Sequence, residues 1–174
     1  VEAVRATLAE LAPQARVVTA RSDLTLDGPP IEGRRVVVVE DGPTLTHGGM
    51  AYGAGVVAAH RFGATLVDPR SAAVGAIRDV LARYPALDAL VPAMGYGAAQ
   101  IADLAATLDA VDADLVLSAT PIDLRRVLTI GKPITRVRYE LAQVDGPPLA
   151  ELIEPIVALA SAPAEATAPA LVGG

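Results

Sequence analysis

The stretch Arg35-Val36-Val37-Val38-Val39-Glu40-Asp41 decides the fold class of this chain. Four consecutive β-branched residues are typical of a strand that helices cover on both faces, because every side chain then has apolar neighbours. Apolar runs at residues 65–67, 89–91 and 115–117 repeat the pattern, with helical spacing between them. Strands that alternate with helices must pair in parallel through crossovers. We therefore expect an α/β fold, a doubly wound, mostly parallel open sheet of the Rossmann-like kind with helices on both faces.

The other expected elements follow from spacing and from residues that stop helices. Apolar residues at Val4, Leu8 and Leu11 predict a first helix that ends before Pro13. A short strand is expected at residues 16–19. Further helices are expected from near Met50 and at residues 72–83, 98–111, near 124 and at 149–160. A last strand at residues 136–141 alternates charged and apolar residues, which is typical of an edge strand with one wetter face.

Composition divides the chain into three parts. Residues 27–33 are rich in Gly and Pro and predict a linker, so a domain boundary is expected near residue 30. The α/β domain should then span residues 31–161. Residues 162–174, rich in Ala, Pro and Gly, have little apolar surface to bury and are predicted to be disordered.

Charge and composition exclude several classes of function. The formal net charge is −6, which disfavours binding to a nucleic-acid backbone, and the chain has no cysteine for a disulfide or a thiolate site. No apolar stretch approaches the roughly 20 residues that cross a bilayer. We expect a cytoplasmic protein without a nucleic-acid or membrane partner, and leave a homodimer open.

The predicted topology places a site at one edge of the sheet. In a parallel sheet the segments that follow the strands meet at the same edge, and ligands bind there. These segments are residues 40–49, 68–70, 92–97 and 118–123. Polar and glycine residues concentrate in them, so we expect them to share one pocket.

The first of these segments carries the candidate catalytic groups. It combines a carboxylate, two hydroxyls and an imidazole, and it ends in a Gly-Gly pair that we expect to open a helix and offer free N–H groups to an anion. In the alternative interpretation, Thr46 only caps that helix and the glycines only allow close packing. The candidate catalytic residues are Asp41, Thr44, Thr46 and His47, and Gly48 and Gly49 are candidates for binding substrate.

The remaining candidates would bind the substrate. A basic cluster, with five positive charges in fourteen residues, would attract a multiply charged anion, although surface salt bridges are the alternative. Its members are Arg125, Arg126, Lys132, Arg136 and Arg138. The other candidates are Tyr52, Asp68, Arg70, Gly95, Tyr96, Thr120 and Asp123. No residues at metal-coordinating spacing occur, and neither a G-x-x-x-x-G-K-[ST] loop nor a G-x-G-x-x-G fingerprint is present, so this chain cannot cradle a nucleoside triphosphate in the usual way.

Five blocks carry a family resemblance: VVVVEDGPTLTHGGMAYGAG, VDPRSAAVGAI, VPAMGYGAAQIADL, SATPIDLRR and KPITRVRYEL. In this order, from about Arg34 to Leu141, they resemble the C-terminal region of the cyclic 2,3-diphosphoglycerate synthetase family, whose bacterial relatives are often described as predicted GTPases. One departure is SAAVG, where the family commonly has a Pro-Tyr pair before AVG.

The resemblance implies a ligase that works with an upstream P-loop domain, and residues 1–30 would be the end of that domain with its linker. ATP and Mg²⁺ would bind mainly there. This chain would hold a small phosphorylated substrate, with clamps drawn from Arg70 and the basic cluster. Two alternatives stay open: a partner-binding or regulatory module of a P-loop GTPase or ATPase, and a binding domain without an enzymatic step.

Overall fold

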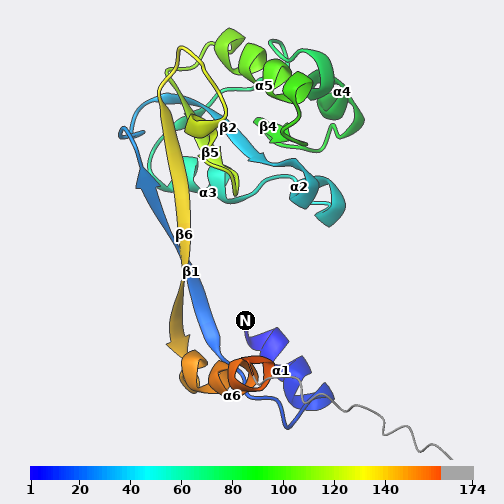
Figure 1. The fold of residues 1–174 in the computed structure, drawn as a ribbon, viewed down its shortest axis with the longest axis vertical. Helices are drawn as coiled ribbons and strands as arrows, with labels where there is room; N and C mark the ends of the chain where they lie inside the picture. The colour runs from blue at the N-terminus through cyan, green and yellow to red at the C-terminus, as the bar shows by residue number, and fades with distance from the viewer. Residues whose placement is uncertain (162–174) are drawn as a thin grey trace, which may run out of the picture. The chain divides into compact units, whose positions relative to one another are not determined.

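The structure is a computed structural model, and it describes residues 1–161 (Figure 1). The predicted disordered tail at residues 162–174 lies outside the described residues. Within the described part, no helix is long and apolar enough to cross a membrane. The elements in chain order are α1 (Glu2–Leu11), β1 (Thr19–Asp27), β2 (Arg35–Asp41), α2 (Gly42–Gly48), α3 (Ala54–Arg61), β3 (Thr65–Leu66), α4 (Gly75–Arg83), β4 (Leu90–Ala93), α5 (Ala98–Ala110), β5 (Leu115–Ala119), the 3₁₀ turn η1 (Leu124–Arg126), β6 (Ile134–Asp145) and α6 (Leu149–Ser161).

The chain divides into two compact units. Leu24–Glu140 form the first, which holds the sheet core and every predicted site residue. Val1–Asp23 and the chain from Leu141 onward form the second, in which an ion pair of 2.8 Å joins Arg5 on α1 to Asp145 at the end of β6. The predicted assignment of residues 1–30 to the end of an upstream nucleotide-binding domain stays a prediction.

The sheet has the strand order β1-β6-β5-β2-β3, and β4 also pairs with β2. Strands β3, β4 and β5 pair in parallel with β2, and β6 pairs in parallel with β5. Helix α3 packs against β2, β3 and β5, whereas α4 packs against β4 and α5. Figure 1 shows α3 and α5 on different sides of β2 and β5. The predicted α/β fold with a mostly parallel, Rossmann-like sheet is therefore confirmed.

The core confirms why the valine run decides the fold. Val36 to Val39 are all fully buried, and so are the central residues of the neighbouring strands. Both faces of β2 are thus covered, as the unbroken β-branched run predicts. Leu104 and Leu108 of α5 complete this apolar layer.

The segment after β2 corrects the sequence prediction. A helix was expected from near Met50, after a polar loop; instead the segment itself forms the short helix α2, and the following helix begins at Ala54. Pro43 fits the first turn of α2 because it needs no helical N–H partner. Gly49 ends α2 in the left-handed conformation, at φ 62°. The Gly-Gly pair therefore closes a helix rather than opening one, and its N–H groups do not form the expected anion site.

Two strand predictions are also corrected. The expected strand at residues 16–19 begins only at Thr19 and continues to Asp27, the first residue of the predicted linker. The last strand is not an edge strand, because β6 lies between β5 and β1. Its alternation instead separates buried Thr135 and Val137 from the arginines between and after them.

We predict that Gly55→Ala destabilises the fold by about 1–3 kcal/mol, the usual effect of overpacking. A Cβ atom at residue 55 would lie 2.6 Å from the Val38 Cγ1 atom and 3.0 Å from both Glu40 Oε1 and the Ala119 Cβ atom. Gly48→Ala is the control, because its Cβ would meet only Met50 side-chain atoms at 3.5 Å or more. Urea unfolding measures both. Equal stability of the Gly55 variant and the parent would contradict the packing described.

Candidate functional site

A cavity of about 210 Å³ lies where the carboxyl ends of the central strands meet. It joins segments far apart in the chain: the end of β2, helix α2, the turn before α3, the end of β5, and β6. Members of the THGG-containing segment, of PIDLRR and of RVRYEL therefore line one cavity. The lining residues are Glu40, Asp41, Thr44, Leu45, Met50, Gly53, Ala54, Ala119, Pro121 and Tyr139.

A larger cavity, of about 470 Å³, lies at the other edge of the sheet. It is lined by residues that precede β2 and by the end of α3, including Glu32, His60 and Arg61. None of the residues predicted to act on or bind substrate lines it. The smaller cavity at the carboxyl edge is therefore the candidate site.

Glu40 is the buried acid of this cavity, with a relative exposure of 3%. Its Oε1 accepts hydrogen bonds from the backbone N–H of Gly55, at 2.8 Å, and of Val56, at 3.1 Å. Glycines make room for the carboxyl group: a Cβ at residue 53 would lie 2.6 Å from Oε2. Burial raises the pKa of Glu40 to about 7, although the bonds from the N terminus of α3 favour the charged form and nearby Asp41 disfavours it.

The four predicted catalytic residues separate into two pairs. Asp41 and Thr44 line the cavity, and the Thr44 hydroxyl donates a hydrogen bond to Asp41 Oδ2. Thr46 Oγ1 instead donates to the Gly42 carbonyl, 3.0 Å away, within α2. His47 is exposed and lies outside the residues that line the cavity. Catalytic roles for all four stay predictions, but the geometry favours the first pair.

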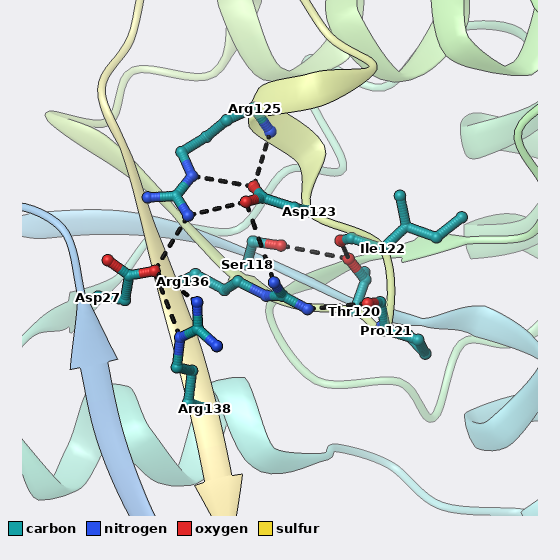
Figure 2. Close-up of polar contacts among 9 residues, drawn as sticks. All are labelled: Asp27, Ser118, Thr120, Pro121, Ile122, Asp123, Arg125, Arg136 and Arg138. Atoms are coloured by element: carbon teal, nitrogen blue, oxygen red, sulfur yellow. Dashed lines mark hydrogen bonds and ion pairs between the residues drawn. The ribbon is translucent and has the colours of Figure 1, made fainter.

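Three arginines and two aspartates form a charge network beside the cavity (Figure 2). The Asp27 Oδ2 atom, at the end of β1, accepts hydrogen bonds of 3.0 Å from both Arg125 and Arg138. Asp123 accepts two bonds from the guanidinium of Arg125, at 2.8 and 2.9 Å. These contacts lower the pKa of Asp27, chiefly through Arg125, and lower the pKa of Asp123 to about 2, again chiefly through Arg125.

Arg136 connects this network to the cavity wall. Its Nη2 donates a hydrogen bond of 2.8 Å to the carbonyl of Pro121, a residue that lines the cavity, and its Nη1 lies 3.9 Å from Asp123 Oδ2. Next to Pro121, the Thr120 hydroxyl donates to the Ile122 carbonyl at 2.7 Å. The network therefore holds the turn after β5 in place and leaves three positive charges against two negative ones.

Other predicted binding residues lie apart from this network. Lys132 Nζ donates to the carbonyls of Leu108 and Asp109 at the end of α5. Arg70 bonds to Asp68, at 2.9 Å, and to the Leu87 carbonyl. Arg126 is exposed beside η1. The five basic residues predicted as one cluster thus include three that share ion pairs, Arg125, Arg136 and Arg138.

Tyr96 follows β4 and points its polar atom into the protein. Within residues 1–161, its Oη is the one fully buried side-chain polar atom without a hydrogen-bond partner. Burial raises the pKa of Tyr96, although the Thr120 hydroxyl is near enough to oppose the shift. Gly95, next to it, leaves room for the Gln100 side chain, whose Oε1 accepts a bond from the Gly97 N–H. Tyr52 is exposed and does not line the cavity.

Sequence reasoning missed Glu40, Asp27 and Tyr139. A signal for Glu40 was present: an acid that extends a buried β-branched run needs polar partners, and Gly53 and Gly55 mark a close approach of backbone. Asp27 was treated as part of a linker. Tyr139 lies in the last strand, where only the charged residues drew attention.

The donor groups do not form a self-contained metal site. In the part of the chain that the structure describes, no three His, Cys, Asp or Glu side chains come together to hold an ion. The glycine-rich segments also lack the phosphate-binding loop that a nucleoside triphosphate needs. Residues 1–161 therefore do not fit a complete site for ATP and Mg²⁺.

Comparison with known proteins gives one clear relative. Over 156 residues the chain is 50% identical to arginine synthetase ArcE of Thermococcus kodakarensis. The match covers 88% of this chain and 35% of the relative, so the chain spans about a third of the length of that protein. No family model matches the chain, and no solved structure matches it. The chain is thus related, over most of its own length, to a protein named as a synthetase.

We predict that Glu40 makes the fold less stable as the pH rises. The folded-state pKa, about 7, lies above the ordinary 4.5, so its favourable contribution is complete below pH 4.5 and is lost as the pH rises through 7. At pH 8 the loss should be about 3 kcal/mol, and Glu40→Gln should remove it. Urea unfolding from pH 5 to 8 measures this. Glu32→Gln, at an exposed acid, is the control, and an unchanged pH dependence in Glu40→Gln would contradict the assignment.

Proposed function

We propose that this chain is the substrate-binding portion of an ATP-dependent synthetase. The observation that carries the proposal is the cavity at the carboxyl edge, which gathers acidic, hydroxyl and aromatic side chains from β2, α2, β5 and β6. The 50% identity to a synthetase supports it independently. Catalysis would then consist mainly of positioning and charge stabilisation, as in other phosphoryl transfers.

ATP and Mg²⁺ would be bound by another part of the full-length protein. The sequence resemblance implies an upstream P-loop domain for this purpose, and residues 1–161 do not form such a site themselves. This chain would supply the cavity and its charged border. The two parts would therefore act only together.

The sequence resemblance makes 2,3-diphosphoglycerate the first candidate substrate, with a cyclic phosphoanhydride as product. The charge network supports an anion: Arg125 and Arg138 share one oxygen of Asp27, and a phosphate group could take its place. Arg136 lies between this pair and the cavity wall. Three guanidinium groups could then neutralise a substrate that carries two phosphates.

Arginine is the second candidate, as the product of a synthetase reaction. The name of the related protein suggests it, and the cavity wall adds an observation: Glu40 and Asp41 are adjacent acids, which suit a cationic nitrogen group better than a phosphate. The arginines of the network would then hold the carboxylate end of the amino acid. Both candidates place the substrate in the same cavity.

We predict that the full-length protein makes product in one of two assays. With ATP, Mg²⁺ and 2,3-diphosphoglycerate, the first candidate gives a cyclic phosphoanhydride that ³¹P NMR detects. With arginine, ADP, phosphate and Mg²⁺, the second gives ATP by the reverse reaction, which a luminescence assay detects. Nucleotide hydrolysis without either product would contradict the proposal and favour a regulatory module of a P-loop GTPase or ATPase.

We predict that Arg136→Ala raises the KM for the substrate at least roughly ten-fold, because a charged hydrogen-bond donor at the cavity wall is lost. The Arg136 side chain is 21% exposed and holds the Pro121 carbonyl. Arg78→Ala is the matched control, since Arg78 is 68% exposed and its acidic neighbour is 3.9 Å away. A KM that does not change in Arg136→Ala would remove this residue from the site.

A further inference from the structure

We propose that Glu40 is a further catalytic residue of this site, the group that accepts the proton of the attacking nucleophile. This role rests on the proposed synthetase function, because a synthetase joins its substrates through a nucleophile that loses a proton. Sequence reasoning gave the acid-base role to His47 or to the hydroxyls of the same segment. The geometry of the cavity points to the acid at the end of β2 instead.

The two oxygens of the Glu40 carboxyl group have different surroundings. Oε1 accepts both hydrogen bonds from the start of α3, so its position is fixed. Oε2 takes part in neither bond and lies beside Gly53, a residue that lines the cavity. Because Oε2 is also absent from the fully buried atoms without a partner, it keeps contact with the space of the cavity. One oxygen anchors the group and the other is free to take a proton.

Burial gives this carboxyl group the basicity that proton transfer requires. An ordinary glutamate is too weak a base to accept protons efficiently at neutral pH, whereas a general base works best when its pKa is close to the working pH. The pKa of Glu40 is raised to about 7 by burial. The cavity therefore provides a base of suitable strength without a histidine.

The charged and titratable groups around Glu40 agree with this role. Asp41 on the same strand disfavours a second negative charge and raises the pKa of Glu40. Tyr139 of β6 lines the cavity, and the Tyr96 hydroxyl, after β4, lies near Asp41. Arg136 donates to the Pro121 carbonyl on the cavity wall. No lysine or arginine bonds to Glu40 in residues 1–161, so no cation holds it in the charged form.

The proposed step balances with the reactants of a synthetase. The nucleophile is an N–H or O–H group of one substrate, and the electrophile is a phosphorylated group of the other. As the new bond forms to the electrophile, phosphate or ADP leaves with the electron pair of the broken bond. The proton of the nucleophile passes to Glu40 Oε2. Release of that proton to solvent through the cavity restores the carboxylate.

Glu40→Gln in the full-length protein tests this role, because an amide oxygen can keep the bonds from Gly55 and Val56 but cannot take the proton. We expect kcat to fall about 10²- to 10⁴-fold with little change in KM. The parent protein should gain activity as the pH rises through about 7, and the variant should lack that limb. Glu32→Gln, which changes an exposed acid outside the cavity, should keep both the rate and the pH profile.

Gly53→Ala is a second variant that keeps the acid. Its Cβ would lie 2.6 Å from Oε2 and would block the proton-accepting oxygen, so kcat should again fall. A parent that turns over while Glu40→Gln keeps its rate and its limb near pH 7 overturns the role of Glu40 alone. If Glu40→Gln does not fold, full activity in Gly53→Ala overturns it. A parent that makes neither product contradicts the proposed function, and the role of Glu40 with it.

Discussion

The bonds between the Glu40 carboxyl group and the first N–H groups of α3 are the interaction on which the site depends. Burying a carboxyl group is unfavourable unless hydrogen bonds compensate for the lost water. Here the start of a helix supplies two N–H donors that no helical carbonyl satisfies. The bonds join the end of β2 to α3, and thereby set one wall of the cavity.

The glycines around this interaction have a common purpose. Gly53 and Gly55 allow the backbone to approach Glu40 more closely than any side chain would permit. Val38 and Ala119, which would also meet a Cβ at residue 55, show that the approach is tight on the side of the sheet as well. Function and packing are therefore coupled at this point: the same close approach that fixes α3 on the sheet also buries the acid.

Most of the fold could be predicted from the sequence because its signals are local. The valine run, the alternating helices and the stop at Pro13 all act within a few residues. The segment after β2 could not, since its polar residues and Gly-Gly pair are typical of a loop, whereas Pro43 and the left-handed Gly49 frame a helix of seven residues. Pairing of β6 with β1 was also beyond local patterns, because the partners are more than one hundred residues apart in sequence.

The site could be predicted by its place but not by its members. Topology alone puts the cavity at the carboxyl ends of the strands, where Asp41 and Thr44 lie as expected. It gives no information on which cations pair with which acids. The predicted basic cluster thus separates into a network of three arginines with Asp27 and Asp123, and into Lys132, which binds the end of α5. Long-range ion pairs of this kind depend on the assembled sheet.

The most direct test is a ¹³C NMR titration of the side-chain carboxyl groups in glutamate-labelled protein, with Glu40→Gln to assign the resonance. The interactions described here predict that Glu40 titrates with a midpoint of about 7, well above an ordinary glutamate. A midpoint near 4.5 would show that the group is solvated in the folded protein, and would contradict both its burial and the catalytic role derived from it.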